Sequence, residues 1–540
     1  MIQGLMMSMP LNIASLIQHA DRHHGSVEIV SRRVEGDLHR TTYRELHRRA
    51  RKLANALASL GIVPGDRVAT LAWNGYRHLE LYFAVSGMGA VLHTINPRLH
   101  PDQIGWIARH AQDQILFFDS SFGALAQAVH RSAPQLRHLV AMTDHDRMAD
   151  AGPEAALCYE DLLQQSSDAF EWPVLDERCA SSLCYTSGTT GDPKGVLYSH
   201  RSTLLHTFAC ALPDALNLSA RDTVLPVVPM FHVNAWGIPY AAPMVGARLV
   251  LPGPRLDGQS LCELFEGERV TMSAGVPTVW QGMLTHLEAN RLKLSTLRRV
   301  VIGGAACAPS MLRALQEQHG VRVLHAWGMT EMSPMGTACT LRAAQLDLPA
   351  SEQAAIQCKQ GRVVYPIDMK VVDEQGQELP WDGKSSGELM VRGPWVASGY
   401  FAGDTAAHEG WFATGDVANI DPDGFMRITD RSKDVIKSGG EWISSIELEN
   451  IALSHPGIAI AACIAVPHPK WDERPLLVVV CKSGQSVSRE ELLAHFAGKV
   501  ARWQVPDDVV FVDAIPLGAT GKLLKGQLRE RFRGHRWPAA

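Results

Sequence analysis

Glycines, hydroxyl side chains and a lysine are concentrated in residues 185–196, which read Tyr-Thr-Ser-Gly-Thr-Thr-Gly-Asp-Pro-Lys-Gly-Val. Small residues let backbone N–H groups approach an anion closely, hydroxyls add further donors, and Lys194 adds a point charge. The pattern predicts a turn that holds the oxygens of a polyphosphate. It is not a Walker A loop, because it lacks the Gly-x-x-x-x-Gly-Lys-Ser/Thr spacing. The alternative for this segment alone is an ordinary surface loop.

The chain is long and apolar enough to form more than one domain. It has 540 residues, of which 46% are hydrophobic and 20% are charged, and this amount of core material favours at least two domains. The net charge of -5 and the pI near 6.5 create no basic field for nucleic acid or an anionic membrane surface. Neither partner is therefore expected.

The sequence gives no sign of export or of a membrane span. Residues 1–18 carry no Lys or Arg and do not resemble a secretory signal, and no apolar run approaches the roughly 18 to 20 residues that cross a bilayer. The ten cysteines include no Cys-x-x-Cys pair, which argues against a structural zinc site. We expect a reduced, cytoplasmic location, with the cysteines acting as small core residues.

Short apolar runs alternate with helical spacing through the first two thirds of the chain. Thr42 has capping-box spacing to Glu45 and precedes apolar residues at helical intervals up to Leu60, so a surface helix is expected there. Strands that alternate with helices are typical of parallel α/β architecture. The expected fold class is therefore α/β, with one large N-terminal unit of doubly wound sheets. Its brief β-rich runs are 68–71, 90–94, 224–228, 247–251, 299–302 and 321–325.

The pattern changes after about residue 365. Short strands separated by turns, such as the turn at 421–424, predict a small, mostly antiparallel β-rich subdomain over 365–431. Farther on, capping boxes at 444–447 and 488–491 and further apolar runs indicate a separate α+β domain. The expected division is an N-terminal domain of 1–431 and a C-terminal domain of 434–540.

Eight further motifs follow the phosphate-binding stretch in chain order. They are Pro229-Met230-Phe231-His232, Gly275-Val276-Pro277-Thr278, Gly303-Gly304-Ala305-Ala306, Trp327-Gly328-Met329-Thr330-Glu331, Gly387-Glu388-Leu389, Thr414-Gly415-Asp416, Asp430-Arg431-Ser432-Lys433-Asp434 and Gly521-Lys522. The series resembles the adenylate-forming superfamily of acyl-CoA synthetases, peptide-synthetase adenylation domains and luciferases, over nearly the whole chain. Residues 231–236 and 438–445 are similar to its fatty-acyl-CoA synthetase branch, which also contains methylmercaptopropionate-CoA ligases.

The resemblance implies an ATP site. Thr186 and Glu331 would hold Mg²⁺, whose preference for hard oxygen ligands suits a hydroxyl and a carboxylate. Asp416, expected in a turn, and Arg431 would bind the ribose. The phosphates would lie against Thr186, Ser187, Gly188, Thr189, Thr190, Gly191 and Lys194. The adenine would lie against Gly303, Gly304, Ala305, Trp327, Gly328 and Thr330, with the Trp327 ring where relatives more often have Tyr.

By the same resemblance, Lys522 is the adenylation lysine, a cation that bridges the attacking carboxylate and the α-phosphate. Thr186, Lys194 and Glu331 complete the expected catalytic set. For thioester formation the family rotates its C-terminal domain, which implies that this domain is mobile about a hinge at 432–433, with Lys433 at the hinge position. The expected channel for CoA is lined by Ser438, Gly439 and Gly440.

His232, Trp236 and Gly303 are the expected acyl pocket. Relatives that activate amino acids have an aspartate where this chain has His232, so an amino acid substrate is not expected. Trp236 resembles a gating aromatic, and the alternative is a fixed pocket wall. The expected activity converts ATP, CoA and a medium- or long-chain fatty acid into acyl-CoA, AMP and diphosphate. A short carboxylate such as 3-methylmercaptopropionate is the alternative substrate.

Two function classes outside the ligases stay open at this point. One is a non-catalytic acyl-nucleotide-binding protein, which the retained charged residues of the motifs disfavour. The other is a luciferase-like oxidase. The resemblance also implies a homodimer formed through the N-terminal domain, and the remaining expected partners are small molecules.

Overall fold

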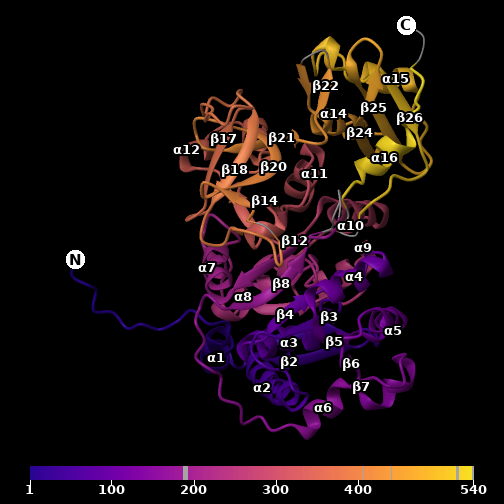
Figure 1. Cartoon of the computed structure of the whole chain (residues 1–540). Coiled ribbons are helices and arrows are strands. Elements are labelled where there is room, and N and C mark those ends of the chain that lie inside the picture. The colour runs from indigo at the N-terminus through magenta and orange to yellow at the C-terminus, as the bar shows by residue number, and fades with distance from the viewer. Residues whose placement is uncertain (187–191, 404, 439–440, 519–521, 538–540) are drawn as a thin grey trace.

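The structure is a computed structural model that describes residues 1–186, 192–403, 405–438, 441–518 and 522–537 (Figure 1). The predicted phosphate-binding residues Ser187, Gly188, Thr189, Thr190 and Gly191 and the predicted channel residues Gly439 and Gly440 lie outside these ranges. The N-terminal half forms the lower part of the view, the β-rich segment lies above it, and the C-terminal domain is at the top.

The first large sheet has seven strands in the order β7-β6-β5-β3-β4-β8-β9. Every neighbouring pair is parallel except β8 and β9, which form an antiparallel hairpin. Its strands are apolar and almost fully buried, as expected where helices cover both faces. They are β3 (Arg67–Leu71), β4 (Val91–Thr94), β5 (Asp113–Phe118), β6 (His138–Ala141), β7 (Leu157–Cys158), β8 (Ala180–Tyr185) and β9 (Gly195–Ser199).

The second large sheet has nine strands in the order β16-β15-β14-β13-β12-β10-β11-β1-β2. Its centre is parallel, and antiparallel strands close both edges. Each β-rich run that the sequence predicted overlaps a strand of one of these sheets. The strands are β1 (Glu28–Arg32), β2 (Leu38–Thr42), β10 (Thr223–Pro226), β11 (Arg248–Leu251), β12 (Met272–Gly275), β13 (Arg299–Ile302), β14 (Arg322–Gly328), β15 (Met335–Ala338) and β16 (Arg362–Val363).

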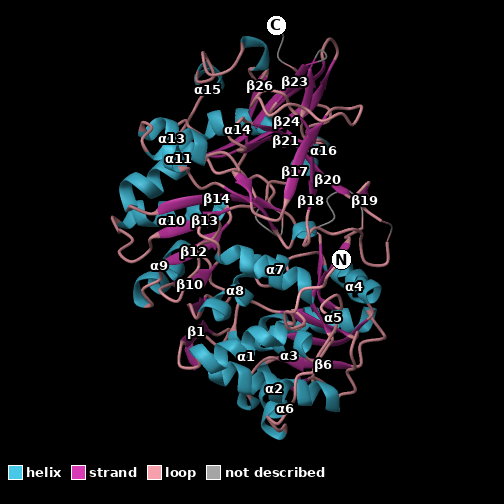
Figure 2. Cartoon of the chain, turned by 90° about the vertical axis from the view of Figure 1, so that its left-hand side faces the viewer, coloured by secondary structure: helices cyan, strands magenta, loops and turns pink. Residues whose placement is uncertain are grey.

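One apolar cluster joins the two large sheets through helices that lie between them (Figure 2). Helix α3 (Tyr76–Gly87) is central, and all twelve of its residues are buried. The other helices of this layer are α1 (Ile13–His24), α2 (Tyr43–Ser59), α7 (His200–Ala211) and α8 (Ile238–Val245). The outer faces are covered by α4 (Pro101–Ala111) and α5 (Gly123–Ser132) on one sheet, and by α9 (Gly258–Gly267), α10 (Pro277–Asn290) and α11 (Pro309–Arg313) on the other. The remaining short helices of this domain are α6 (Tyr159–Gln165), α12 (Ala343–Leu346) and α13 (Ala350–Gln357).

The predicted helix caps form at Thr42, Ser444 and Ser488, but only the box at Ser488 is complete. The Oγ1 of Thr42 accepts from the N–H of Glu45 at 3.4 Å and begins α2 as expected. The return half of that capping box is absent, because the Glu45 carboxylate pairs with Arg48 at 2.5 Å instead. The box at Ser488 and Glu491 is complete and begins α15 (Arg489–Ala494).

The β-rich segment forms a five-stranded antiparallel sheet. The prediction that Asp416 lies in a turn is wrong, because Asp416 lies within a long strand. Only the glycine before it, Gly415 at φ 71°, has a turn-like backbone. The strands are β17 (Asp368–Val372), β18 (Gly387–Arg392), β19 (Ala407–His408), β20 (Trp411–Ile420) and β21 (Met426–Arg431).

The C-terminal domain has its own five-stranded sheet with an apolar cluster on each face. The α/β class with a C-terminal α+β domain is thereby confirmed. Its elements are β22 (Ile436–Ser438), β23 (Glu441–Ile443), α14 (Ser445–Leu453), β24 (Ile458–His468), β25 (Asp472–Cys481), α15, β26 (Asp508–Phe511) and α16 (Lys525–Arg531). No helix in the described part of the chain combines the length and apolar character needed to cross a bilayer. Seven of the ten cysteines are buried and all ten are free thiols.

Candidate active site

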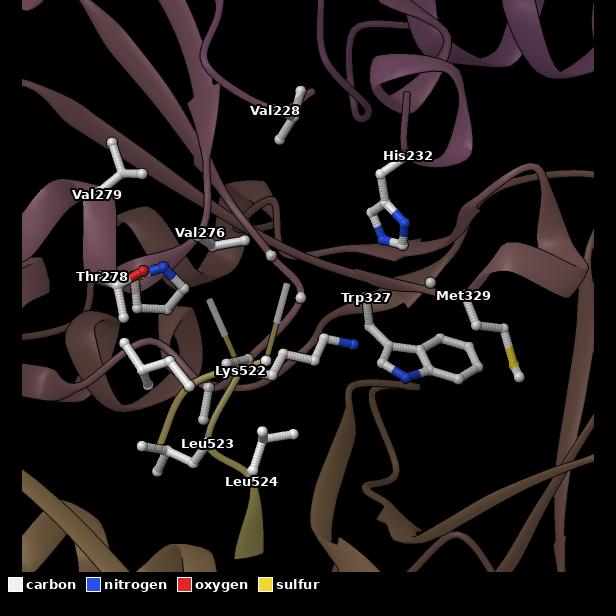
Figure 3. A pocket seen from close by; sticks show the side chains of 18 of the residues that line it. Val228, His232, Val276, Thr278, Val279, Trp327, Met329, Lys522, Leu523 and Leu524 are labelled. Atoms are coloured by element: carbon white, nitrogen blue, oxygen red, sulfur yellow. The ribbon is translucent and has the colours of Figure 1, made fainter. Parts of the chain in front are cut away.

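A cavity of about 2790 Å³ lies where the two large sheets, the β-rich segment and the C-terminal domain meet. Figure 3 shows part of its lining, with Lys522 extending from the C-terminal domain toward Trp327 and His232 of the N-terminal domain. The motifs that are far apart in the sequence therefore converge on one space. The predicted site residues that line it are Thr186, Lys194, His232, Trp236, Gly303, Gly304, Ala305, Trp327, Gly328, Thr330, Glu331, Arg431, Lys433 and Lys522.

The ends of the phosphate-binding stretch are fixed by the β8–β9 hairpin. The N–H of Thr186 donates to the carbonyl of Lys194 at 2.9 Å, and the N–H of Lys194 donates to Thr186 Oγ1 at 3.2 Å. Because the two strands pair directly up to Tyr185 and Gly195, both flanking residues are held at the cavity wall by the sheet.

Tyr400 links the predicted lysine and the predicted metal-binding carboxylate. Its hydroxyl donates to Glu331 Oε1 at 2.9 Å, and the Nζ of Lys194 lies 4.8 Å from the centre of its ring. The main chain of Glu331 is also held, since its carbonyl accepts from the N–H of Ala397 at 2.7 Å. The sequence analysis missed Tyr400, which stands in none of the motifs.

Trp327, Asp416 and Arg431 form a connected group. The indole N–H of Trp327 donates to Asp416 Oδ2 at 2.9 Å, and the Nε of Arg431 lies 3.5 Å from Asp416 Oδ1. Asp416 and Arg431 face each other across the β20–β21 pair. The Asp416 carboxylate is largely buried, whereas Arg431 is about half exposed. The two residues predicted to bind the ribose are therefore adjacent to the tryptophan predicted to stack on adenine.

Gly303 belongs to both the predicted nucleotide site and the predicted acyl pocket. A Cβ placed there would come within 2.9 Å of the carbonyl oxygen of Ala326 and 3.1 Å of the Trp236 indole. Any side chain at position 303 would therefore crowd both the Ala326 carbonyl and the Trp236 indole. This crowding explains why glycine is needed at this position.

The Trp236 segment has an unusual backbone. Its φ angles are all positive although none of its residues is glycine: Val233 45°, Asn234 50°, Ala235 46° and Trp236 57°. Each such residue costs roughly 1–2 kcal/mol relative to the right-handed conformation. The buried Asn234 side chain holds the segment, since its amide donates to Ser182 Oγ at 3.0 Å and its Oδ1 accepts from Tyr82 at 3.3 Å. The sequence analysis missed Asn234.

Lys522 carries its amine into the nucleotide end of the cavity. Burial, followed by the nearby charge of Arg431, lowers its pKa to about 8, while Asp416 and Glu331 act in the opposite direction. Burial and the charge of Lys522 lower the pKa of His232 to about 3, so the imidazole is neutral at physiological pH. The site therefore combines a cation, which the charges of Asp416 and Glu331 favour, with an uncharged imidazole at the predicted acyl pocket.

The predicted hinge residue Lys433 lines the cavity, whereas the predicted channel residue Ser438 does not. Lys433 lies two residues after the end of β21 and lines the cavity. Ser438 is buried within β22, does not line the cavity, and accepts from Arg474 at 3.1 Å. In this arrangement the structure brings the ATP residues together with Lys522 and leaves Ser438 outside the group.

The oxygen donors at the site suit a magnesium ion that arrives with a nucleotide. Among the described residues no cluster of three His, Cys, Asp or Glu side chains is suited to hold a metal. The Glu331 carboxylate and the Thr186 hydroxyl both line the cavity. Mg²⁺ commonly takes one or two protein oxygens and completes its shell with phosphate and water, so these donors fit that ion.

The sequence pattern of the AMP-binding enzyme family matches residues 16–401, and the pattern of the AMP-binding enzyme C-terminal domain matches 447–522. The chain belongs to the AMP-binding enzyme family. The resemblance that the motifs indicated is confirmed, and this AMP-binding enzyme is an AMP-forming acyl-CoA ligase.

Similar proteins agree over almost the full length of this AMP-binding enzyme. A 3-methylmercaptopropionyl-CoA ligase of Ruegeria lacuscaerulensis is 55% identical over 98% of this chain and 99% of its own. A medium-chain-fatty-acid–CoA ligase of Ectopseudomonas oleovorans is 53% identical over 98% and 97%. The crystal structure of an anthranilate CoA ligase with anthranoyl-AMP superimposes with a TM-score of 0.87 over 97% and 98%, and at 24% identity it shows the shared fold.

Proposed function

We propose that this AMP-binding enzyme is a fatty acid–CoA ligase for medium- or long-chain acids. In the first step the carboxylate oxygen attacks the α-phosphorus of ATP, an O–P bond forms, and diphosphate leaves. In the second step the CoA thiol loses its proton and its sulfur attacks the acyl carbonyl, a C–S bond forms, and AMP leaves. The observation that carries the proposal is that Lys522, Glu331 and Trp327, which is bonded to Asp416, line the same cavity as apolar side chains.

The chain's own residues have defined tasks in the first step. Asp416 accepts from the ribose hydroxyls, with its orientation fixed by Trp327. Lys194 lies at the phosphate end, against Tyr400. Lys522 stabilises the charge that develops between the carboxylate and the α-phosphate, and a preorganised cation in a buried site is effective in this task. Thr186 and Glu331 would hold Mg²⁺, which neutralises phosphate charge when bound.

The acyl side of the cavity supports an alkyl substrate. Apolar side chains of the nine-stranded sheet and its helices contribute to the cavity lining, and a nonpolar chain gains about 0.8 kcal/mol for each CH₂ that it buries. The neutral His232 offers no charge to pair with a substrate ammonium. The apolar lining residues are Val228, Val276, Val279, Leu284, Leu287 and Met311.

A short thioether acid such as 3-methylmercaptopropionate is the second candidate. The Trp236 indole lies so near Gly303 that a Cβ there would come within 3.1 Å of it, and an indole that stays in this place favours a short acid. The 55% identity to a 3-methylmercaptopropionyl-CoA ligase supports this alternative.

A panel of C3 to C18 carboxylic acids, including 3-methylmercaptopropionate and read by AMP release with ATP, Mg²⁺ and CoA, tests both candidates. A kcat/KM maximum at medium or long chains supports the main proposal, and a maximum at the thioether acid supports the second. A chain that releases no AMP with any acid contradicts both. Omitting Mg²⁺ should abolish AMP release.

The second step requires a second arrangement of the C-terminal domain. Rotation about 432–433, with Lys433 at the hinge, would withdraw Lys522 and bring Ser438, Gly439 and Gly440 to the site, where small residues leave room for pantetheine. We also propose a cytoplasmic homodimer that forms through the N-terminal domain. Size-exclusion chromatography with light scattering tests the dimer, and fractionation of the source cells tests the location.

A further inference from the structure

Lys525 is a buried lysine that follows the adenylation lysine by three residues. It begins helix α16, and only 9% of its surface is exposed. Its Nζ lies 2.6 Å from Glu449 Oε1 and donates to Ser445 Oγ at 2.6 Å. Both partners belong to α14, so Lys525 joins α16 to α14 inside the C-terminal domain.

The segment between Lys522 and Lys525 has little freedom. The N–H of Gly518 donates to the carbonyl of Lys522 at 2.7 Å, and the N–H of Leu524 donates to the carbonyl of Pro516 at 2.9 Å. Leu517 and Leu523 form a β-bridge between these bonds. Because residues 522–524 are paired with residues 516–518 and lead directly into Lys525, fixing Lys525 also restrains the backbone that carries the Lys522 side chain.

Helix α14 is in turn bound to the strand that precedes the hinge. The buried Asp430 accepts through Oδ2 from the N–H of Ser445 at 2.6 Å. The hydroxyl of Ser444 donates to the carbonyl of Thr429. Asp430 is the neighbour of Arg431, which contacts Asp416. A continuous series of polar contacts therefore runs from the ribose-binding strand, through α14 and Lys525, to Lys522.

A rotation of the C-terminal domain about residues 432–433 would preserve some of these contacts and break others. Lys525, Glu449 and Ser445 all lie on the C-terminal side of residues 432–433 and would move as one body. The contacts of Asp430 with Ser445 and of Thr429 with Ser444 cross that point and would have to break. The first group therefore sets the place of Lys522 within its domain, and the two crossing contacts hold that domain in the arrangement described here.

We propose that Lys525 is a positioning residue for adenylation: through its ion pair with Glu449 it holds the hairpin that presents Lys522 to the nucleotide. The proposal rests on the proposed function, since it assigns Lys525 to one of the two half-reactions. Misplacing a catalytic group by about 1 Å can cost on the order of a hundredfold in rate. The second half-reaction does not use Lys522 and should not depend on Lys525.

The test measures the two half-reactions separately in the full-length enzyme, with diphosphate release in the absence of CoA and thioester formation from preformed acyl-AMP. Lys525→Met should slow the first about tenfold to a hundredfold and change the second less than about threefold. Lys525→Arg keeps the positive charge and should restore most of the first rate. Arg489→Met is the matched control, because it removes an ion pair with Asp508 at 2.5 Å elsewhere in the same domain, and it should change neither rate.

Glu449→Gln is a second variant, because it removes the negative charge of the ion pair with Lys525. The glutamine amide oxygen can still accept from the N–H of Cys463, a contact of 2.8 Å in the wild type. The variant should reproduce the selective loss without a change in the circular dichroism spectrum. Three results would overturn the inference about Lys525 without affecting the proposed function. They are an equal loss of both half-reactions in Lys525→Met and Glu449→Gln, an unchanged rate of the first half-reaction in these variants, and no recovery of that rate in Lys525→Arg. A wild-type enzyme that releases no diphosphate with any acid would overturn the proposed function as well.

Discussion

The indole N–H of Trp327 donates to the carboxylate of Asp416 at 2.9 Å. The residue expected to stack on adenine therefore also orients the residue expected to bind the ribose. The two belong to different sheets, β14 and β20, so this bond also joins the large domain to its β-rich segment. An aromatic ring without an N–H donor at position 327 could still stack on adenine, but it could not hold the Asp416 carboxylate.

Trp327→Phe should raise the KM for ATP with little effect on the KM for the acid. A hydrogen bond to a charged group contributes about 1.5–3 kcal/mol, so an increase of about tenfold or more is expected. Trp395→Phe is the matched control, because it removes a buried indole bond of 2.9 Å to the carbonyl of Met335 from a side chain that does not itself line the cavity. Initial rates at varied ATP decide the result, and an equal rise in both variants would contradict the assignment.

Lys522→Ala should abolish acyl-adenylate formation and leave CoA transfer from preformed acyl-AMP largely intact. Removing one preorganised electrostatic contact commonly costs about 10²–10³ in rate. Exchange of labelled diphosphate into ATP, dependent on the acid, measures the first step. Parallel loss of both steps would refute the view that Lys522 acts in a single arrangement of the domains.

The adenylation rate should fall at alkaline pH. Burial, then the charge of Arg431, lowers the pKa of Lys522 to about 8, so the cation is present below that pH and lost above it. The kcat/KM for ATP in the first half-reaction should drop about tenfold for each pH unit beyond this value. Lys522→Arg keeps its charge and should lack this alkaline limb. A limb that persists in that variant would belong to another group.

Two substitutions of Asn234 separate its hydrogen bonds from its backbone strain. Asn234→Gly and Asn234→Ala both remove the buried amide and should lower the free energy of unfolding by about 1–3 kcal/mol. The alanine variant should be less stable than the glycine variant by about 1 kcal/mol, because only glycine adopts positive φ without cost. Denaturant unfolding measures both.

Asn217 is the control for this comparison, because it is exposed and has a similar φ of 53°. The difference between glycine and alanine should reappear at Asn217, and the larger shared loss should not. Equal stability of the two Asn234 variants would mean that the backbone of this segment relaxes.

Trp236→Ala should uncouple fatty-acid affinity from ATP, if the indole acts as a gate. In the wild type an ATP analogue should tighten acid binding, measured by calorimetry, and in the variant the two affinities should be independent. An unchanged dependence on the analogue would leave Trp236 as a fixed wall of the pocket.

The sequence predicted the strands well because central parallel strands are short apolar runs. The sequence of helix α3 shows no clear alternation of polar and apolar residues, because a helix buried on all sides has no polar face to mark its period. Its charged residues could not be read as partners: Glu80 is fully buried and pairs with Arg49 at 2.6 Å from another helix. That pairing depends on how α2 and α3 pack together, which no local pattern encodes.

At the site, the motifs supplied the residues that are predicted to touch the nucleotide, and they gave no role to the residues that hold the motifs in place. Tyr400 and Asn234 contact residues that are distant in the chain, and the left-handed turn at 233–236 contains no glycine to signal it. The capping rule placed Ser444 correctly, yet gave no sign that its hydroxyl also reaches Thr429 across the hinge. Long-range contacts of this kind follow from the tertiary arrangement.

The cavity wall around Lys522 belongs to a separate domain, and this has a consequence for the fate of the mixed anhydride. An acyl phosphate ester is prone to hydrolysis, and a nucleotide held by the N-terminal domain alone would be open to bulk water. In the proposed role of Lys522, the activating cation belongs to the same domain that closes the space, so the reactive species would form only where that domain covers it. Wasteful turnover of ATP would then be limited by the arrangement of the domains.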